Sequence, residues 1–381
     1  MTGGQTPSWG LGWQAADRLG IYIRNSGNTL LRAQAPTSPV LGLEGDWHHF
    51  LAVRGNGRLQ YYMDGDLLDD QADTIGNITN TKPITVARHY DASTGNTMSG
   101  IFDDVAIWDE PLTAGQAYTL GRLAVPANTV AAYSNPVLES NPVAYWRLEE
   151  LVSVAKAADW SGNNRTGTYT GGTKGAAHPL PYDPANVGVI LNGSSDYISP
   201  DSSLPASIFS GGSYSVEMWF NADTLHQGDL AAFTTSAGHA ILLELETNGK
   251  IRFLHRWPAG GSGGTDIYST NLYTTDEWHY LVAVKDGADM KLYLDGVLDP
   301  TTATDASTIN GALDLALGRI GKSISGRYFN GMLDDIALYD RALTYEEIYY
   351  HYTGIAIPEP ATLSLLGLGA LGLLRRRRRG R

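Results

Sequence analysis

The sequence has no cysteine in its 381 residues. This absence excludes disulfides, thiolate metal sites and a cysteine nucleophile. Positive charge is also scarce: 27 Lys and Arg stand against 40 Asp and Glu, and six of the arginines fall in the last seven residues. Because the body of the chain is so acidic, it repels nucleic-acid phosphates, and we expect no nucleic-acid partner.

Glycine and aromatic residues, by contrast, are abundant: 44 Gly, 21 Tyr, 9 Trp and 7 Phe, together with 17 Pro. This mixture favours many short strands joined by tight turns over long helices. The length is enough for two domains that each bury their own core.

The C-terminus carries the sharpest local signal. Pro358-Glu359-Pro360 precedes an uncharged, mostly apolar run, Ala361 to Leu374, and the arginine cluster follows directly. As a helix those 14 residues would span roughly 21 Å, short of a ~30 Å hydrocarbon core, although terminal arginines can extend to the headgroups. Positive charge stays cytoplasmic, so the pattern places the chain before Pro358 outside. The alternative is a buried hydrophobic helix with a solvated basic end.

This tail resembles the PEP-CTERM sorting signal, which has a Pro-Glu-Pro motif, a Leu/Gly/Ala-rich helix and a terminal arginine cluster in the same order. The resemblance implies an exosortase-type enzyme that processes the tail near Pro358, Glu359 and Pro360. It also implies an exported bacterial protein, held for a time in the inner membrane with its arginine-rich end in the cytoplasm.

Two stretches of the chain are related by a constant offset of 231 residues. Trp47-His48 reappears as Trp278-His279, and residues 100–106 match residues 331–337 without a gap. A fixed offset over so many positions indicates two copies of one module.

The two copies are unequal. About 135 residues of strand-like sequence, starting near Val143, precede Trp278, whereas subtracting the offset from 143 gives a negative position. The first copy therefore lacks about 90 residues of its expected start, and the first residues show no signal peptide. Both absences predict a truncated chain or a misplaced start codon. The alternative is a compact half-module that docks on its neighbour.

Hairpin and helix signals recur in both copies. Asp64-Gly65 and Asp295-Gly296 stand between apolar strand patterns, which is typical of a tight hairpin. Thr113 with Gln116, and Thr344 with Glu347, fit capping boxes at the start of short helices. The sequence therefore predicts an all-β fold of tandem antiparallel jelly-roll β-sandwiches, the first one truncated, plus a short C-terminal hydrophobic helix. The predicted boundaries are 1–122 for the partial sandwich, 123–142 for a linker, 143–354 for the complete sandwich and 355–381 for the tail.

Several motifs together resemble the LamG-like jelly-roll family of the concanavalin A-like lectin/glucanase superfamily. They are Tyr145–Leu148, Asp159–Gly162, Tyr214–Trp219, Trp278–Tyr280, Leu294–Gly296 and Gly331–Asp340. The resemblance covers residues 143–353 fully and residues 10–123 in part. It implies two curved antiparallel sheets, and carbohydrate or protein binding in many members, sometimes with calcium, but it specifies no ligand.

Catalytic motifs are weak. Glu244 and Glu246 alternate as glucanase acids do, but the third acid and an aromatic cluster are missing, so we interpret them as solvent-facing acids on an edge strand. Residues 260–264 fit the G-x-S-x-G pattern, yet a nucleophile elbow needs a strand before it and a helix after it. We therefore expect no catalytic residues in this chain.

Three groups of residues are candidates for binding. Adjacent acids on a strand point to opposite faces, so one member of Asp334-Asp335, and of the repeat pair Asp103-Asp104, is expected to face inward or to lie at a sheet end. A buried carboxylate needs hydrogen bonds or a cation, so calcium at Asp334 and Asp335 is one possibility, and a carboxylate that pins a neighbouring loop is the other.

His255 and Trp257 lead into a glycine-rich loop, where the indole could stack on a sugar ring or lie in the core. His48 and His279 have no partner at metal-ligand spacing and are interpreted as structural.

These features favour an exported, noncatalytic binding protein of the cell surface or extracellular matrix, with an extracellular polysaccharide or glycoprotein as partner and no required cofactor. The alternatives are a polysaccharide-active glycoside hydrolase or lyase of the same superfamily, whose catalytic part could lie upstream, and a structural spacer of the envelope.

Overall fold

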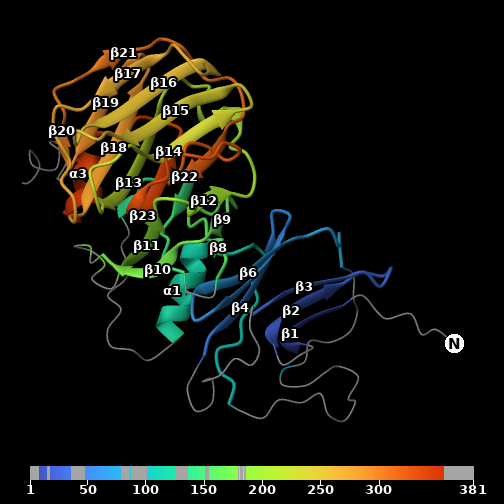
Figure 1. Cartoon of the computed structure of the whole chain (residues 1–381). Coiled ribbons are helices and arrows are strands. Elements are labelled where there is room, and N and C mark those ends of the chain that lie inside the picture. Colours follow the sequence, from blue (N-terminus) through green and yellow to red (C-terminus); the bar gives the residue numbers. More distant parts are fainter. Residues whose placement is uncertain are drawn as a thin grey trace, which may run out of the picture.

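The computed structural model shows two β-rich units, one for each copy of the repeat (Figure 1). It describes residues 8–14, 18–35, 48–78, 86, 101–124, 136–150, 154–178, 180, 183 and 186–355. The strands pair in antiparallel fashion in several sheets, and the helices are short. The predicted all-β jelly-roll class is confirmed.

The second unit is a sandwich of two sheets. In the described part, one sheet has nine strands: β7 (Ala144–Trp146), β10 (Thr173–Ala177), β11 (Val187–Asn192), β13 (Tyr214–Ala222), β18 (His279–Asp286), β19 (Asp289–Leu294), β20 (Val297–Leu298), β21 (Ala303–Thr304) and β23 (Asn330–Tyr339). The other has eight: β8 (Lys156–Ala157), β9 (Gly167–Thr170), β12 (Tyr197–Pro200), β14 (Gly228–Thr235), β15 (Gly238–Leu245), β16 (Ile251–Gly260), β17 (Thr265–Tyr268) and β22 (Asp314–Leu317). A 3₁₀ turn, Ala206–Ile208, lies between β12 and β13.

Strand alternation explains how the two sheets face each other. On β18, Leu281 and Ala283 point into the sandwich core, while Tyr280 and Val282 point to the outer face. In the nine-stranded sheet the order β10-β11-β23-β13-β18-β19-β20 places β23 and β13 at the centre, and β7 also pairs with β23. In the eight-stranded sheet the order is β17-β16-β15-β14-β22-β12-β9-β8. The central strand β23 thus depends on β7, β11 and β13, which come from much earlier in the chain.

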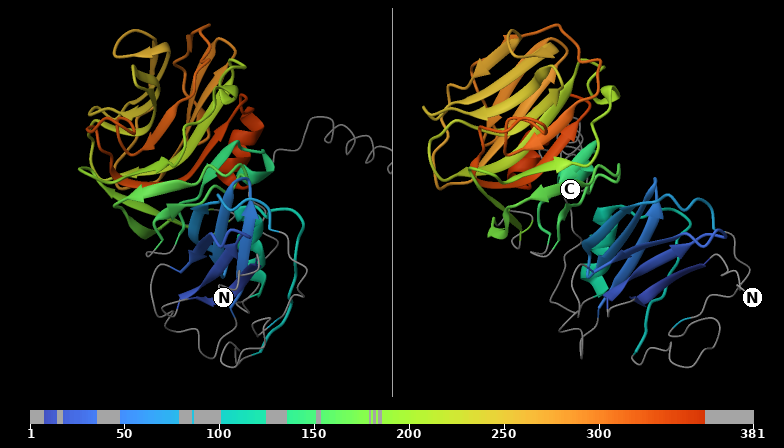
Figure 2. Two further views of the ribbon diagram at one scale, coloured as in Figure 1. Left: turned by 90° about the vertical axis from the view of Figure 1, so that its right-hand side faces the viewer. Right: turned by 45° about the vertical axis from the view of Figure 1, so that its right-hand side comes forward.

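Among its described residues, the first unit contains two small sheets (Figure 2). One consists of β1 (Ser8–Gln14), β2 (Arg18–Arg24) and β3 (Leu30–Gln34), and the other of β4 (Phe50–Gly55), β5 (Arg58–Met63) and β6 (Asp66–Ala72). They share a core of apolar residues that includes Ile21, Leu59 and Tyr61. The offset of 231 residues carries β5 onto the bounds of β19, and β1 onto β15 to within one residue.

Each copy ends in a capped helix, as the sequence predicts. α3 (Tyr345–Thr353) begins with a capping box in which Thr344 and Glu347 exchange side-chain and backbone hydrogen bonds. α1 (Ala114–Ala124) begins with the same arrangement, because Thr113 N donates to Gln116 and Gln116 N donates to Thr113 Oγ1. The capping-box pattern in the sequence therefore predicts the start of a helix correctly in both copies.

A second apolar cluster joins the two units. It covers the outer face of the nine-stranded sheet with α3 and continues to residues of the first unit, including Val53, Tyr62 and Ala117. Figure 1 shows α1 between the two bodies. Trp160 of the second unit, 7% exposed, belongs to the same cluster. The first unit therefore packs on its neighbour through a buried apolar seam.

The predicted linker, residues 123–142, contains the one-turn helix α2 (Pro136–Glu139). It packs beside α3, where Ser140 Oγ lies 2.8 Å from His351 Nε2. The predicted tail, including Pro358, Glu359 and Pro360, lies outside the described residues. Within the residues that are described, we find no helix with the length and apolar character needed to cross a bilayer.

Candidate functional site

A polar row crosses four neighbouring strands on the outer face of the eight-stranded sheet. Strand register places Tyr268 on β17 opposite Arg252 on β16, Arg252 opposite Glu244 on β15, and Glu244 opposite Asp229 on β14. Directly opposed residues on antiparallel strands have neighbouring side chains, so the four side chains form one continuous line. We call these four residues the transverse row.

Glu244 is the anchor of the transverse row. Its side chain is fully buried, and it accepts hydrogen bonds from Arg252 Nη1 at 2.9 Å, Arg327 Nη1 at 2.7 Å and Gln227 Nε2 at 2.9 Å. A buried carboxylate is tolerated because charged donors surround it. The two arginines are thereby fixed in position on the sheet.

This geometry corrects the interpretation of Glu244 and Glu246 as solvent-facing acids on an edge strand. That interpretation is wrong for Glu244, because β15 lies between β14 and β16 and the arginines cover the carboxylate. Glu246 follows the end of β15 and is half-buried. A local alternating pattern could not reveal this, since Arg252 comes from the neighbouring strand β16 and Arg327 from the segment that precedes β23.

Asp229 is the most unusual member of the transverse row. Its side chain is fully buried, and neither of its oxygens has a hydrogen-bond partner; Arg327 Nη1 lies 3.9 Å away. Burial, and then the neighbouring Glu244, raises the pKa of Asp229 well above its ordinary value. Burial next to Glu244 therefore favours the protonated, neutral form of Asp229 over its charged form.

The surface of the row is open to solvent at one end. At this end Tyr268 is 41% exposed and the Asp266 side chain is 31% exposed, while Arg327, which lies beside Glu244 and Asp229, has a side chain that is 33% exposed. Arg252 donates through Nε to Asp266 at 2.8 Å, and its guanidinium lies 5.8 Å from the Tyr268 ring centroid. This end presents an aromatic ring beside the guanidinium of Arg252 and the carboxylate of Asp266.

His255 and Trp257, predicted as ligand contacts, are placed differently from each other. His255 is buried on β16, with Nδ1 3.0 Å from Tyr214 Oη and Nε2 3.1 Å from Ser307 O. Burial, and then Lys285, lowers the pKa of His255 to about 4. Both ring nitrogens are therefore engaged inside the protein. Trp257 is half-buried and packs against the sandwich core.

Asp334 and Asp335 are both buried, in contrast to the predicted opposite orientations. The physical reason is a bulge: Asp335 has a φ of 45°, and the register between β13 and β23 shifts at this point. The two carboxylates therefore lie close together, and burial together with Asp335 raises the pKa of Asp334 well above its ordinary value.

The partners of this acid pair are protein groups. Asp334 Oδ2 lies 2.7 Å from His178 Nδ1 and 2.5 Å from Asn186 Nδ2, and Asp334 Oδ1 accepts from the Asp335 amide. Asp335 accepts from Tyr145 Oη and, at 3.3 Å, from Asn186. All four carboxylate oxygens thus have protein hydrogen-bond partners. No group of three or more metal-binding side chains was found in the described part of the chain. Calcium binding stays a prediction.

The predicted structural histidines hold the two hairpins. His279 Nδ1 lies 2.9 Å from Asp295 Oδ2, and His48 Nδ1 lies 2.8 Å from Asp64 Oδ2. The same aspartates accept from the next backbone amide, Tyr280 or His49. The G-x-S-x-G stretch, residues 260–264, connects β16 to β17 rather than a strand to a helix.

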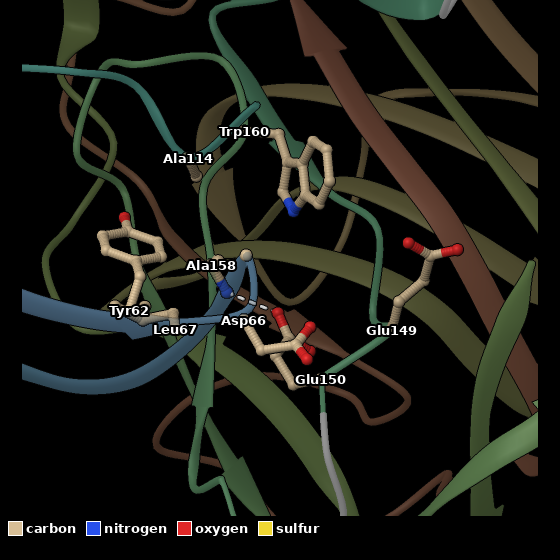
Figure 3. A pocket seen from close by; sticks show the side chains of 9 residues that line it. Tyr62, Asp66, Leu67, Ala114, Glu149, Glu150, Ala158 and Trp160 are labelled. Carbon is tan, nitrogen blue, oxygen red and sulfur yellow. Dashed lines mark hydrogen bonds between the residues drawn. The ribbon is translucent and has the colours of Figure 1, made fainter. Parts of the chain in front are cut away.

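A small hollow lies in the seam between the two units (Figure 3). Tyr62 and Leu67 of the first unit and Glu149, Glu150 and Trp160 of the second line it. Glu150 accepts from the Ala158 amide at 2.7 Å, and burial raises the pKa of Glu149 to about 8. The hollow has room for about one water molecule. It belongs to the packing of the seam and is too small for an organic ligand.

Comparison with known proteins identifies the fold family. A family model described as the concanavalin A-like lectin/glucanases superfamily matches residues 1–117 and 192–349. The chain belongs to this superfamily. A second model, the PEP-CTERM protein-sorting motif, matches residues 356–379, so the predicted sorting signal is confirmed. This motif implies an exported, envelope-associated protein that an exosortase processes.

Solved structures of similar shape include three proteins. Domain 4 of AbnA, a GH43 extracellular arabinanase from Geobacillus stearothermophilus in complex with arabinotriose, has 20% identity, a TM-score of 0.40, and coverage of 56% of this chain and 98% of that one. A heptameric SAP-like pentraxin from Limulus polyphemus has 16% identity, a TM-score of 0.37, and coverage of 44% and 82%. The botulinum neurotoxin type G receptor-binding domain has 13% identity, a TM-score of 0.42, and coverage of 56% and 51%. No match was found among curated protein sequences.

Proposed function

We propose that this superfamily member is a noncatalytic saccharide-binding protein of the bacterial exterior, and that the exposed end of the transverse row is its binding surface. The observation that carries the proposal is the exposed Tyr268 ring beside Arg252, whose guanidinium is held on the sheet by hydrogen bonds to Glu244 and Asp266. An aromatic face suits the apolar side of a sugar ring, and fixed planar donors suit its hydroxyl or carboxylate oxygens.

The burial of Glu244 supports a binding role over hydrolysis. A glycosidase needs two carboxyl groups that flank the scissile bond and reach the substrate. Glu244 and Asp229 are both fully buried on the sheet, Glu244 under two guanidinium groups and Asp229 with its pKa strongly raised. A polysaccharide partner also suits a protein with a sorting signal for the envelope. We retain the division into residues 1–122, 123–142, 143–354 and 355–381 as part of the proposal.

Binding of the full-length protein to an immobilised array of neutral and acidic polysaccharides tests this function. We expect retention by the wild type and a loss of about tenfold or more in affinity for Tyr268→Ala, because stacking on the ring is removed. Tyr345→Ala is the matched control, since Tyr345 is a similarly exposed tyrosine (48%) on α3, away from the row.

Two outcomes would contradict the proposal. One is binding that Tyr268→Ala and Tyr345→Ala affect equally. The other is release of reducing ends from the array that disappears in Glu244→Gln, which would indicate a hydrolase. Repeating the assay with EDTA tests the predicted calcium dependence separately.

A further inference from the structure

A loop that connects the two sheets of the second unit lies across the outer face of the eight-stranded sheet. It comprises residues 318–329, which follow β22 and lead into β23. The loop meets β14 near both ends of that strand: Arg327 O accepts from the Asp229 amide at 2.9 Å, and a Cβ atom at Gly321 would lie 3.1 Å from Thr234 Cγ2. We call residues 318–329 the cover loop.

A short apolar row lies between these two contacts. Ala232 on β14 is opposite Leu242 on β15, and Leu242 is opposite Leu254 on β16. All three are buried, and they form a cluster separate from the sandwich core. Leu242 and Leu254 are two residues from Glu244 and Arg252, so they face the same side of the sheet. We call these three residues the apolar row, and it lies directly beside the transverse row.

The cover loop adds little apolar packing of its own. Among residues 320–328, all of which the structure describes, Gly321 is the one buried residue, and Ile324 is 40% exposed. Burial of apolar side chains is the main force that holds an element against its neighbours. The cover loop can therefore lift from the sheet at a small cost in free energy.

Polar contacts hold the cover loop in its closed position. Arg327 Nη1 donates to Glu244 at 2.7 Å, and Lys322 Nζ donates to Pro200 O at 2.8 Å. Water can replace each of these partners when the loop lifts. Arg327 also has a φ of 46°, in the left-handed region that side chains other than glycine adopt at a cost. Lifting releases this conformation.

The carboxyl group of Asp229 gains partners when the loop lifts. It is buried, and neither of its oxygens has a hydrogen-bond partner in the closed position. A buried polar group without a partner is costly, and contact with water or a ligand removes that cost. A protonated carboxyl group both donates and accepts, which suits a sugar hydroxyl. Glu244 meanwhile retains Arg252 and Gln227 as donors.

The charges beside the apolar row favour an uncharged ligand. Arg252 is balanced by Glu244 and Asp266, with which it forms hydrogen bonds at 2.9 and 2.8 Å. Arg256, two residues after Leu254 on the same face of β16, donates to backbone carbonyl groups of the glycine-rich loop. Because the positive groups on this face are already engaged, an anionic sugar gains little here.

We propose that the saccharide surface has a covered half, formed by the apolar row and Asp229, and that the cover loop lifts to admit an uncharged saccharide. This inference rests on the proposed saccharide site, of which the exposed end at Tyr268 is the open half. One sugar stacks on Tyr268, and the following sugars extend over the apolar row, where Asp229 exchanges hydrogen bonds with a hydroxyl group. Without ligand, Arg327 and Lys322 hold the loop closed.

A reversible cross-link between the cover loop and β14 tests the proposal. A Cβ atom at Gly321 would lie 3.8 Å from Thr234 Cβ, a typical separation for a disulfide, and the chain has no cysteine of its own. The full-length double variant Thr234→Cys, Gly321→Cys is therefore compared in its oxidised and reduced forms. Thr234→Cys alone is the matched control, because it cannot form a cross-link within the chain.

The first measurement needs no saccharide. A carbodiimide and an amine label accessible carboxyl groups, and Asp229 is the one carboxyl residue between Asp223 and Glu244, so mass spectrometry can assign its label. We expect labelling of Asp229 to be about tenfold or more slower in the oxidised double variant than in the reduced one. Lys322→Ala, which removes one tether, should speed labelling by about threefold or more. Equal labelling in both redox forms, or none in either, would overturn the proposal.

The second measurement is retention on immobilised dextran and xylan, with alginate as the acidic probe. We expect oxidation of the double variant to lower the affinity for the neutral polysaccharides by about tenfold or more, and reduction to restore it. Binding that Tyr268→Ala removes but oxidation leaves unchanged would overturn the covered half and leave the proposed function intact. Stronger retention on alginate would overturn the uncharged ligand. Retention of the wild type on none of the three would refute the proposed function and this inference with it.

Discussion

The hairpin β4–β5 and its counterpart β18–β19 have the same structure, whereas residues 101–108 and their counterpart β23 do not. Each hairpin is fixed by one aspartate, Asp64 or Asp295, that binds a histidine about 16 residues earlier. β23 instead depends on strands that lie more than 100 residues before it. Interactions close in sequence therefore form in both copies, and a central strand forms only where its distant partners are present.

The largest expected difference between the copies is in side-chain burial on the central strand. Ile336→Ala should lower the free energy of unfolding of the second unit by about 2–5 kcal/mol, because it leaves a cavity in the core. The repeat-equivalent change Val105→Ala should alter stability by less than about 0.5 kcal/mol, because Val105 is 64% exposed. Urea unfolding followed by tryptophan fluorescence measures both. Equal losses would show that residues 101–108 are packed like β23.

A smaller and matched effect is expected for the two hairpins. Asp295→Ala and Asp64→Ala each remove one hydrogen bond to a histidine and one to a backbone amide. Each should cost about 1–3 kcal/mol in the free energy of unfolding of its own unit. Asp289→Ala, an exposed acid in the second hairpin, serves as the control in the same urea experiment. A loss in only one of the two units would refute the equivalence of the hairpins.

The smallest effect concerns the seam between the copies. The folded protein raises the pKa of Glu149 to about 8 through burial, so its carboxyl group binds a proton more tightly when folded than when unfolded. The stability it contributes is present below the ordinary pKa of glutamate and is lost as the pH rises through about 8. Between pH 6.5 and pH 8.5 the wild type should therefore lose stability more steeply than Glu149→Gln.

The buried histidines do not interfere in this pH range. Burial lowers the pKa of His178 to about 3 and that of His255 to about 4, so their contributions are lost only as the pH falls below about 6.5. Glu346→Gln, at an exposed position of α3, is the control. An identical pH slope in wild type and Glu149→Gln would contradict the assignment.

Local features of the fold were predictable from the sequence. The Asp-Gly turns, the alternation on β18 and the Thr113 and Thr344 caps depend on residues a few positions apart, and the structure has all of them. The sorting signal is likewise one continuous segment.

The candidate site was only partly predictable. The sequence indicated Glu244 as a candidate acid but predicted that its side chain faces solvent. The prediction failed because Arg252 and Arg327, which cover the carboxylate, come from other parts of the fold. Tyr268 was missed, since its place beside Arg252 follows from the register of β16 and β17. The burial of both Asp334 and Asp335 depends on a bulge that strict alternation does not predict. The sequence indicated this site only through Glu244, a polar residue that alternates with leucines on a central strand.

Amide hydrogen exchange of the full-length protein, without any added ligand, tests most directly whether the two copies differ in their central strand. We expect residues 332–339 to exchange on the order of 10³-fold more slowly than residues 101–108, because β23 is hydrogen-bonded between β11 and β13. Comparable, concentration-independent protection of the two segments would contradict it.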